Sequence, residues 1–292
     1  MIAETIPSLL SAALYAALIV VIGSLGVYWL VLPRCGLVAT EGTPVARRAA
    51  TSAMLASVAV LLIVPMRVLT QLTQLLEPGE PWREAFNAIA FSTQSGMAAQ
   101  LQIVWAMAAF FAFSVARTGR PRGWRVATIA VIMLAITPGL GGHPATASRP
   151  ILAMTVATMH VLGAGLWIGT LYHLWQASNV FSLATIERMV RAFHGVAISA
   201  VGLLVITGAY ASLTTLQHVS DLVRTPWGVL LTLKLLAVMA VLTLGGWHLR
   251  TAGLQLARGR NASVRSTIGL ELVFALVVIV LTGFLAGTGP PE

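Results

Sequence analysis

The chain has 292 residues, of which 58% are hydrophobic and only 9% are charged, with 18 Lys and Arg against 9 Asp and Glu. Soluble domains average about 25% charged residues, so this composition excludes a water-soluble globular protein. It predicts an all-α polytopic membrane protein. The single cysteine, Cys35, excludes a disulfide framework and any paired-cysteine metal or redox motif. The sequence has no GxxxxGK[ST] phosphate-binding loop, so we expect no ATP hydrolysis by this chain and no enzyme activity.

Eight apolar segments are long enough to cross a bilayer core, which takes about 20 residues of helix. We therefore expect one integral membrane domain over residues 1–292, built as a bundle of eight transmembrane helices. The segment between the second and third spans contains Pro81 and Trp82, which suit the start of a short interfacial helix running through Phe91. The predicted spans are residues 8–32, 49–70, 95–116, 124–141, 150–176, 192–216, 227–249 and 266–287.

The connections between the spans alternate in charge. Thirteen arginines fall on one side of the membrane, in the connections 33–48, 117–125, 177–191 and 250–265. The positive-inside rule places these loops in the cytoplasm and both termini on the outer side of the membrane. Topology then accounts for the positive net charge, so we expect the lipid bilayer as a partner and no nucleic acid.

A weak internal similarity divides the chain into halves 1–146 and 147–292, each with four spans. Two such halves would share one orientation and be related by an axis along the membrane normal. Chance similarity between apolar sequences is the alternative. The matching residues are Ile22-Gly23-Ser24-Leu25 and Trp29 with Ile168-Gly169-Thr170-Leu171 and Trp175, and Thr93, Gly96, Leu101 and Gln102 with Thr225, Gly228, Leu233 and Lys234.

Ionisable side chains at membrane depth are costly, so each is a candidate for function. His160 lies about 15 Å along the fifth span, on a face of small residues that points into the bundle. It is either a neutral histidine bonded to a carbonyl or, with His143 at the outer end of the fourth span, a ligand for copper. Thioethers suit Cu(I), and Met97 and Met154 lie near the right depth. Gap-filling in the core is the alternative for both methionines, and Met154 lies about 120° around its helix from His160.

Two further charges fall inside predicted spans. Lys234 lies between the depths of His143 and His160, where it is either a structural anchor or a functional charge. Glu271 lies near the cytoplasmic end of the last span. With the three histidines that flank this end it forms a second candidate cluster, read either as interfacial residues or as a cation exit site. These histidines are His173, His194 and His248.

Taken in order, motifs over residues 140–290 resemble the copper resistance protein D (CopD) family. They are Gly142-His143, Met159-His160, Leu166-Trp167-Ile168-Gly169-Thr170-Leu171, Phe193, Thr207-Gly208, Trp227-Gly228, Leu233-Lys234-Leu235 and Glu271-Leu272. The resemblance implies an inner-membrane protein of copper handling that works with a separate periplasmic copper-binding protein of the CopC type. It also implies His143 and His160 as copper contacts. His194 departs from the family pattern, which leaves the cytoplasmic cluster without family support.

We therefore expect a copper homeostasis or resistance protein that binds copper ions at the periplasmic side and carries them across the membrane. The alternative is a b-type haem protein of electron transfer, because buried histidines on packed helices also ligate haem. A purely structural membrane subunit is the third interpretation.

Overall fold

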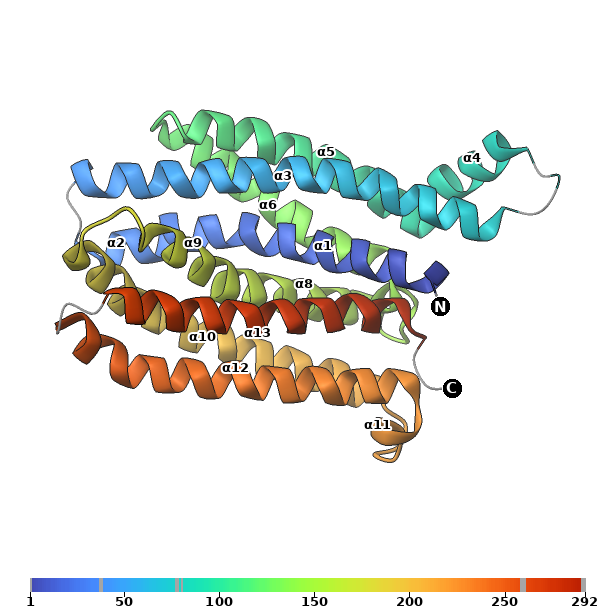
Figure 1. Cartoon of the computed structure of the whole chain (residues 1–292). Coiled ribbons are helices and arrows are strands. Elements are labelled where there is room, and N and C mark those ends of the chain that lie inside the picture. The colour runs from blue at the N-terminus through green and yellow to red at the C-terminus, as the bar shows by residue number, and fades with distance from the viewer. Residues whose placement is uncertain (1, 37–38, 77–78, 80, 258–260, 290–292) are drawn as a thin grey trace.

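The computed structural model describes residues 2–36, 39–76, 79, 81–257 and 261–289 (Figure 1). It is 89% helical, and the described residues contain no strand. Eight helices or unbroken helical runs within this part have the length and hydropathy to cross a membrane. The predicted all-α polytopic membrane fold is therefore confirmed.

The first and fifth spans each contain a π-helical segment. The first consists of α1 (Ile2–Leu25), the π-helix η1 (Gly26–Val31) and α2 (Leu32–Arg34). The fifth consists of α8 (Pro150–Ala164), η2 (Gly165–Gly169) and α9 (Thr170–Ala177). The remaining elements are α3 (Ala39–Leu75), α4 (Trp82–Ser92), α5 (Gln94–Ala116), α6 (Pro121–Leu140), α7 (His143–Thr146), α10 (Leu183–Thr215), α11 (Asp221–Arg224), α12 (Pro226–Ala257) and α13 (Asn261–Gly287).

Several helices run past the apolar segments that predicted them. The helices α3, α10 and α12 continue for two to three turns beyond the predicted spans 49–70, 192–216 and 227–249, in the direction of the arginine-rich connections. Apolar length measures only the part of a helix that lies in hydrocarbon, whereas hydrogen bonding continues into the polar region. The short helix expected to run through Phe91 is present as α4.

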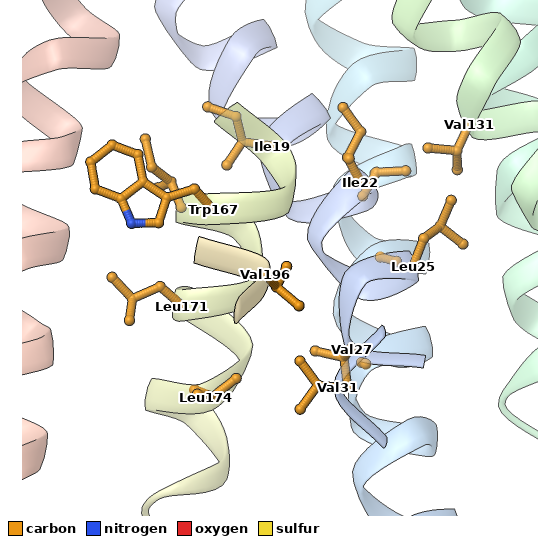
Figure 2. Close-up of a cluster of buried hydrophobic side chains, with 14 of the residues drawn as sticks. Ile19, Ile22, Leu25, Val27, Val31, Val131, Trp167, Leu171, Leu174 and Val196 are labelled. Carbon is orange, nitrogen blue, oxygen red and sulfur yellow. The ribbon is translucent and has the colours of Figure 1, made fainter. Parts of the chain in front are cut away.

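The start of α1, the end of α13 and the short helices α4 and α11 all lie at one end of the bundle, called the terminus end below (Figure 1). The arginine-rich connections lie at the opposite end. The helix α1 is the centre of the bundle, because α3, α13 and the η2–α9 run all pack against it. Figure 2 shows side chains from α1, η1, η2, α9 and α10 gathered around this centre, with Ile22, Trp167 and Val196 among them.

The closest approach in the core is between the first and fifth spans. A Cβ atom added at Gly169 would lie 2.9 Å from the Cα of Gly23 and would overlap the carbonyl oxygen of Ile19. A Cβ added at Gly23 would in turn overlap the backbone of Gly169. Glycine at both positions thus lets the two backbones touch, which is how small residues promote helix association in membranes.

The helices α5 and α12 begin with the same hydrogen-bond pattern. Thr93 caps α5, because its hydroxyl accepts from the N–H of Gly96 at 2.9 Å and donates to the carbonyl of Ile89 at 2.6 Å. At α12, Thr225 makes the same two bonds, with lengths of 3.0 Å and 2.8 Å. A further side-chain bond back to the preceding short helix also recurs, from Gln100 to the carbonyl of Ala90 at 2.7 Å and from Thr232 to that of Leu222 at 3.0 Å.

Candidate functional site

His160 lies where α8 meets α10. Its Nδ1 is 2.9 Å from the hydroxyl oxygen of Thr207, and the side chain is partly buried. The next residue, Gly208, faces the same ring, since a Cβ there would lie 3.5 Å from Cε1 of His160. The imidazole therefore lies against one turn of α10, so His160 points towards a neighbouring helix as predicted.

Thr207 is buried and has a second hydrogen bond inside its own helix. Its Oγ1 is 2.7 Å from the carbonyl oxygen of Leu203 and 3.3 Å from that of Leu204. Threonine often returns a bond to the carbonyl four residues earlier in a helix. Here the same oxygen also contacts an imidazole, so Thr207 links the α10 backbone to His160. The chemistry of a threonine side chain did not single out Thr207 as a site residue. The one sequence feature that pointed to it was the Thr207-Gly208 pair among the motifs that resemble the CopD family.

Lys234 on α12 lies close enough to His160 for an electrostatic interaction between the two side chains, and it is partly buried. Three helices, α8, α10 and α12, thus bring His160, Thr207 and Lys234 to one region within the membrane-spanning segments. The ammonium is cationic, so it repels a second positive charge in this region. It also donates hydrogen bonds to any electron-rich atom that enters.

The other predicted ligands of the outer site are placed differently. His143 begins α7, and its side chain lies outside the described part of the structure. Met97 is 60% exposed at the start of α5. Met154 lies opposite Gly139 of α6, where an added Cβ would be 3.5 Å from the Cα of Met154.

At the arginine-rich end, the predicted cluster is only partly described. His173 on α9 is 4% exposed, and its Nε2 lies 3.0 Å from the carbonyl oxygen of Val20 on α1. His194 is exposed on α10, so these two histidines lie in different surroundings. The side chain of His248 is outside the described residues. Glu271 is buried on α13 and faces α12, because a Cβ at Gly245 would lie 3.8 Å from its Oε2.

Where side chains are described, no three His, Cys, Asp or Glu residues form a group able to hold a metal ion. Of the two predicted histidine ligands of the outer site, His160 is the one whose side chain the structure describes. A single imidazole with a neighbouring ammonium suits brief contact with a metal ion better than permanent retention.

Residues 187–285 match the profile of one protein family, which is described as copper resistance protein D (CopD). The matched segment contains nearly all of α10 and α13 and the whole of α12, so it includes Thr207, Lys234 and Glu271. No curated protein and no solved structure matches the chain. The resemblance predicted from the sequence is confirmed over this segment.

Proposed function

We propose that this chain, whose residues 187–285 match the copper resistance protein D family, binds copper ions in the bacterial inner membrane and carries them across it. The family match and the eight candidate spans support a multi-pass membrane protein related to copper resistance. One observation carries the finer proposal. His160 is held by Thr207 and accompanied by Lys234 inside the membrane-spanning region, where an unexplained ionisable group is expected to act on cargo.

Copper fits this site through its preference for imidazole. His160 supplies one neutral nitrogen donor, and we assign His143, at the start of α7, as its partner nearer the terminus end. Conduction requires a site that binds its ion firmly enough to admit it and weakly enough to release it. The positive charge of Lys234 weakens cation binding at His160, which favours passage of copper over storage.

The distribution of arginines gives the proposed orientation of the protein in the membrane. Arginines gather in the connections at one end of the bundle, and the positive-inside rule assigns that end to the cytoplasm. The terminus end then faces the periplasm, and His143 and His160 are reached from there. In this orientation, a separate periplasmic copper-binding protein of the CopC type is the proposed donor of copper.

We also propose that residues 1–146 and 147–292 are two copies of one four-span unit. The identical capping bonds of Thr93 and Thr225 support this, as does the contact between Gly23 and Gly169, which occupy equivalent positions. Equivalent residues meet where a twofold axis passes between them. Gln102, which is 3% exposed, corresponds to Lys234, so the first copy lacks the charge that marks the second.

Haem b is the second candidate, because the nitrogen that would bind copper could also be an axial ligand of haem iron. The two candidates separate on one measurement. Protein purified from cells grown with both copper and a haem precursor is expected to carry copper and show no Soret band. A strong Soret band that disappears in His160→Ala would replace the copper proposal with the haem one.

The main test compares His160→Ala with His194→Ala at equal expression. His194 is exposed on α10, and the proposed function gives it no part in copper binding, although it belongs to the candidate cluster at the arginine-rich end, so it is the matched control for loss of an imidazole. Cells with His160→Ala are expected to differ from wild type in copper content and copper tolerance, whereas cells with His194→Ala are expected to match wild type. Equal copper content and tolerance in all three strains would remove His160 from the site.

A further inference from the structure

We infer that Thr207 is a positioning residue that fixes the tautomer of His160, so that Nδ1 carries the proton and Nε2 keeps the free lone pair. The use of that lone pair for copper rests on the proposed function. The tautomer itself does not, since it follows from hydrogen bonds within the chain.

The assignment follows from counting protons at Thr207. A threonine hydroxyl has one proton to donate and two lone pairs that accept. Its oxygen lies 2.7 Å from the carbonyl oxygen of Leu203, which can only accept, so the hydroxyl proton goes there. The contact of 2.9 Å with Nδ1 of His160 is then a hydrogen bond only if Nδ1–H donates to Thr207.

The opposite tautomer loses one of these two bonds. If the hydroxyl of Thr207 donated to Nδ1, its lone pairs would face the carbonyl oxygen of Leu203 across 2.7 Å with no proton between them. Thr207 is buried, so water does not readily replace the lost bond. The carbonyl of Leu203 keeps its helical bond from the backbone N–H of Thr207, so the opposite tautomer loses one hydrogen bond, worth about 0.5–1.5 kcal/mol, and places two oxygen lone pairs against each other.

Gly208 supports the same orientation from the next position of α10. A Cβ at Gly208 would lie 3.5 Å from Cε1 and 3.9 Å from Nδ1 of His160, so this part of the ring lies beside the α10 backbone. The Nδ1 edge of the ring is thus occupied by α10. Nε2 is left as the nitrogen that meets an incoming ligand, and metal-bound histidines commonly donate their other N–H to such a protein group.

The test reads the tautomer directly in protein that contains no copper. Histidine labelled with ¹⁵N distinguishes protonated from unprotonated ring nitrogens by NMR, and His160→Asn identifies the His160 signals. In wild type and in Thr207→Ser, which keeps the hydroxyl, we expect protonated Nδ1 and unprotonated Nε2. In Thr207→Val, which has nearly the same shape without the hydroxyl, we expect the proton to move to Nε2 in a large fraction of molecules.

Two results would overturn the inference: a wild-type His160 protonated at Nε2, or the same tautomer in wild type and Thr207→Val. Equal thermal unfolding of the variants, followed by circular dichroism, shows that the comparison is between folded proteins. If Thr207→Val unfolds early, the comparison of wild type with Thr207→Ser still decides the inference, because different tautomers in these two would contradict it.

Copper binding is then measured on the same variants by titrating Cu(I) against a competing chelator. Loss of such an orienting partner typically weakens metal affinity by about 10–100-fold, so we expect a weakening in this range for Thr207→Val and wild-type affinity for Thr207→Ser. If wild type binds no Cu(I) while its tautomer is as inferred, the copper proposal fails and the role of Thr207 stands. Equal Cu(I) affinity in wild type and Thr207→Val would show that the tautomer does not control binding.

Discussion

Replacing Gly169 with alanine is expected to force apart the first and fifth spans. The added methyl group would lie 2.9 Å from the Cα of Gly23 and 2.9 Å from the carbonyl carbon of Ile19, and closer still to the oxygen of Ile19. All three are backbone atoms of α1, so no side-chain rotation relieves the overlap. Either the helices separate or the crossing shifts along the axis.

The size of the effect follows from the location of this contact. Overpacking of a well-packed core costs about 1–3 kcal/mol, and a collision with backbone belongs at the upper end of that range. The crossing also lies at the centre of the bundle, beside the fully buried Val21 and Val27 and the buried Trp167. With a shift of about 2–4 °C per kcal/mol, Gly169→Ala is expected to lower the unfolding temperature by about 6–12 °C.

The assay is thermal unfolding in detergent, followed by circular dichroism, with Gly202→Ala as the matched control. Gly202 also lies in a membrane-spanning helix, α10, but a Cβ there has no atom within 4 Å outside its own helix. Gly202→Ala is therefore expected to unfold at the wild-type temperature or slightly above it. Equal unfolding temperatures for the two variants would refute the close packing of the first and fifth spans.

Three further predictions concern other parts of the chain. Thr225→Val removes the cap of α12 and is expected to destabilise the protein by about 1 kcal/mol; unchanged unfolding would contradict the observed cap. Trp124→Ala opens a cavity beside Tyr28, on which it stacks at 4.1 Å, and is expected to cost about 3 kcal/mol; a loss well below 1 kcal/mol would contradict that packing. Burial raises the pKa of the Cys35 thiol to about 11, although the charge of Arg188 opposes the shift. Because the thiolate is the reactive form, alkylation of Cys35 in the folded protein is expected to be slow at pH 8 and to rise about tenfold per pH unit towards that value; a plateau near pH 9 would show that the thiol is not shielded.

The membrane fold follows from the sequence because the bilayer imposes one dominant constraint. Backbone groups in hydrocarbon must be bonded internally, so apolar stretches of sufficient length become helices. The π-helical turns at Gly26–Val31 and Gly165–Gly169 were not predicted. Such turns form where an extra residue is fitted into a helix, and apolar periodicity carries no clear signal for them.

The candidate site was predictable only in part. Depth along each helix identified His160 and Lys234 as buried candidates, and the structure brings them near one another. Depth also suggested Met97, whose side chain is 60% exposed at the start of α5. Position along a helix follows from counting residues, but the direction of a side chain depends on the rotation of that helix against its neighbours, which the local sequence does not encode.

The sequence alone determined that this chain is a bundle of eight membrane helices, because long apolar segments in a bilayer must form helices to bond their backbone groups. Its motifs also predicted the resemblance to the copper resistance protein D family, whose profile matches residues 187–285. The pattern of arginines added its predicted orientation. Only the tertiary structure decided that α1 is the central helix and that Thr207 is the partner of His160. Both facts depend on contacts between different helices (His160 and Thr207 are 47 positions apart), and such contacts exist only after the helices have packed.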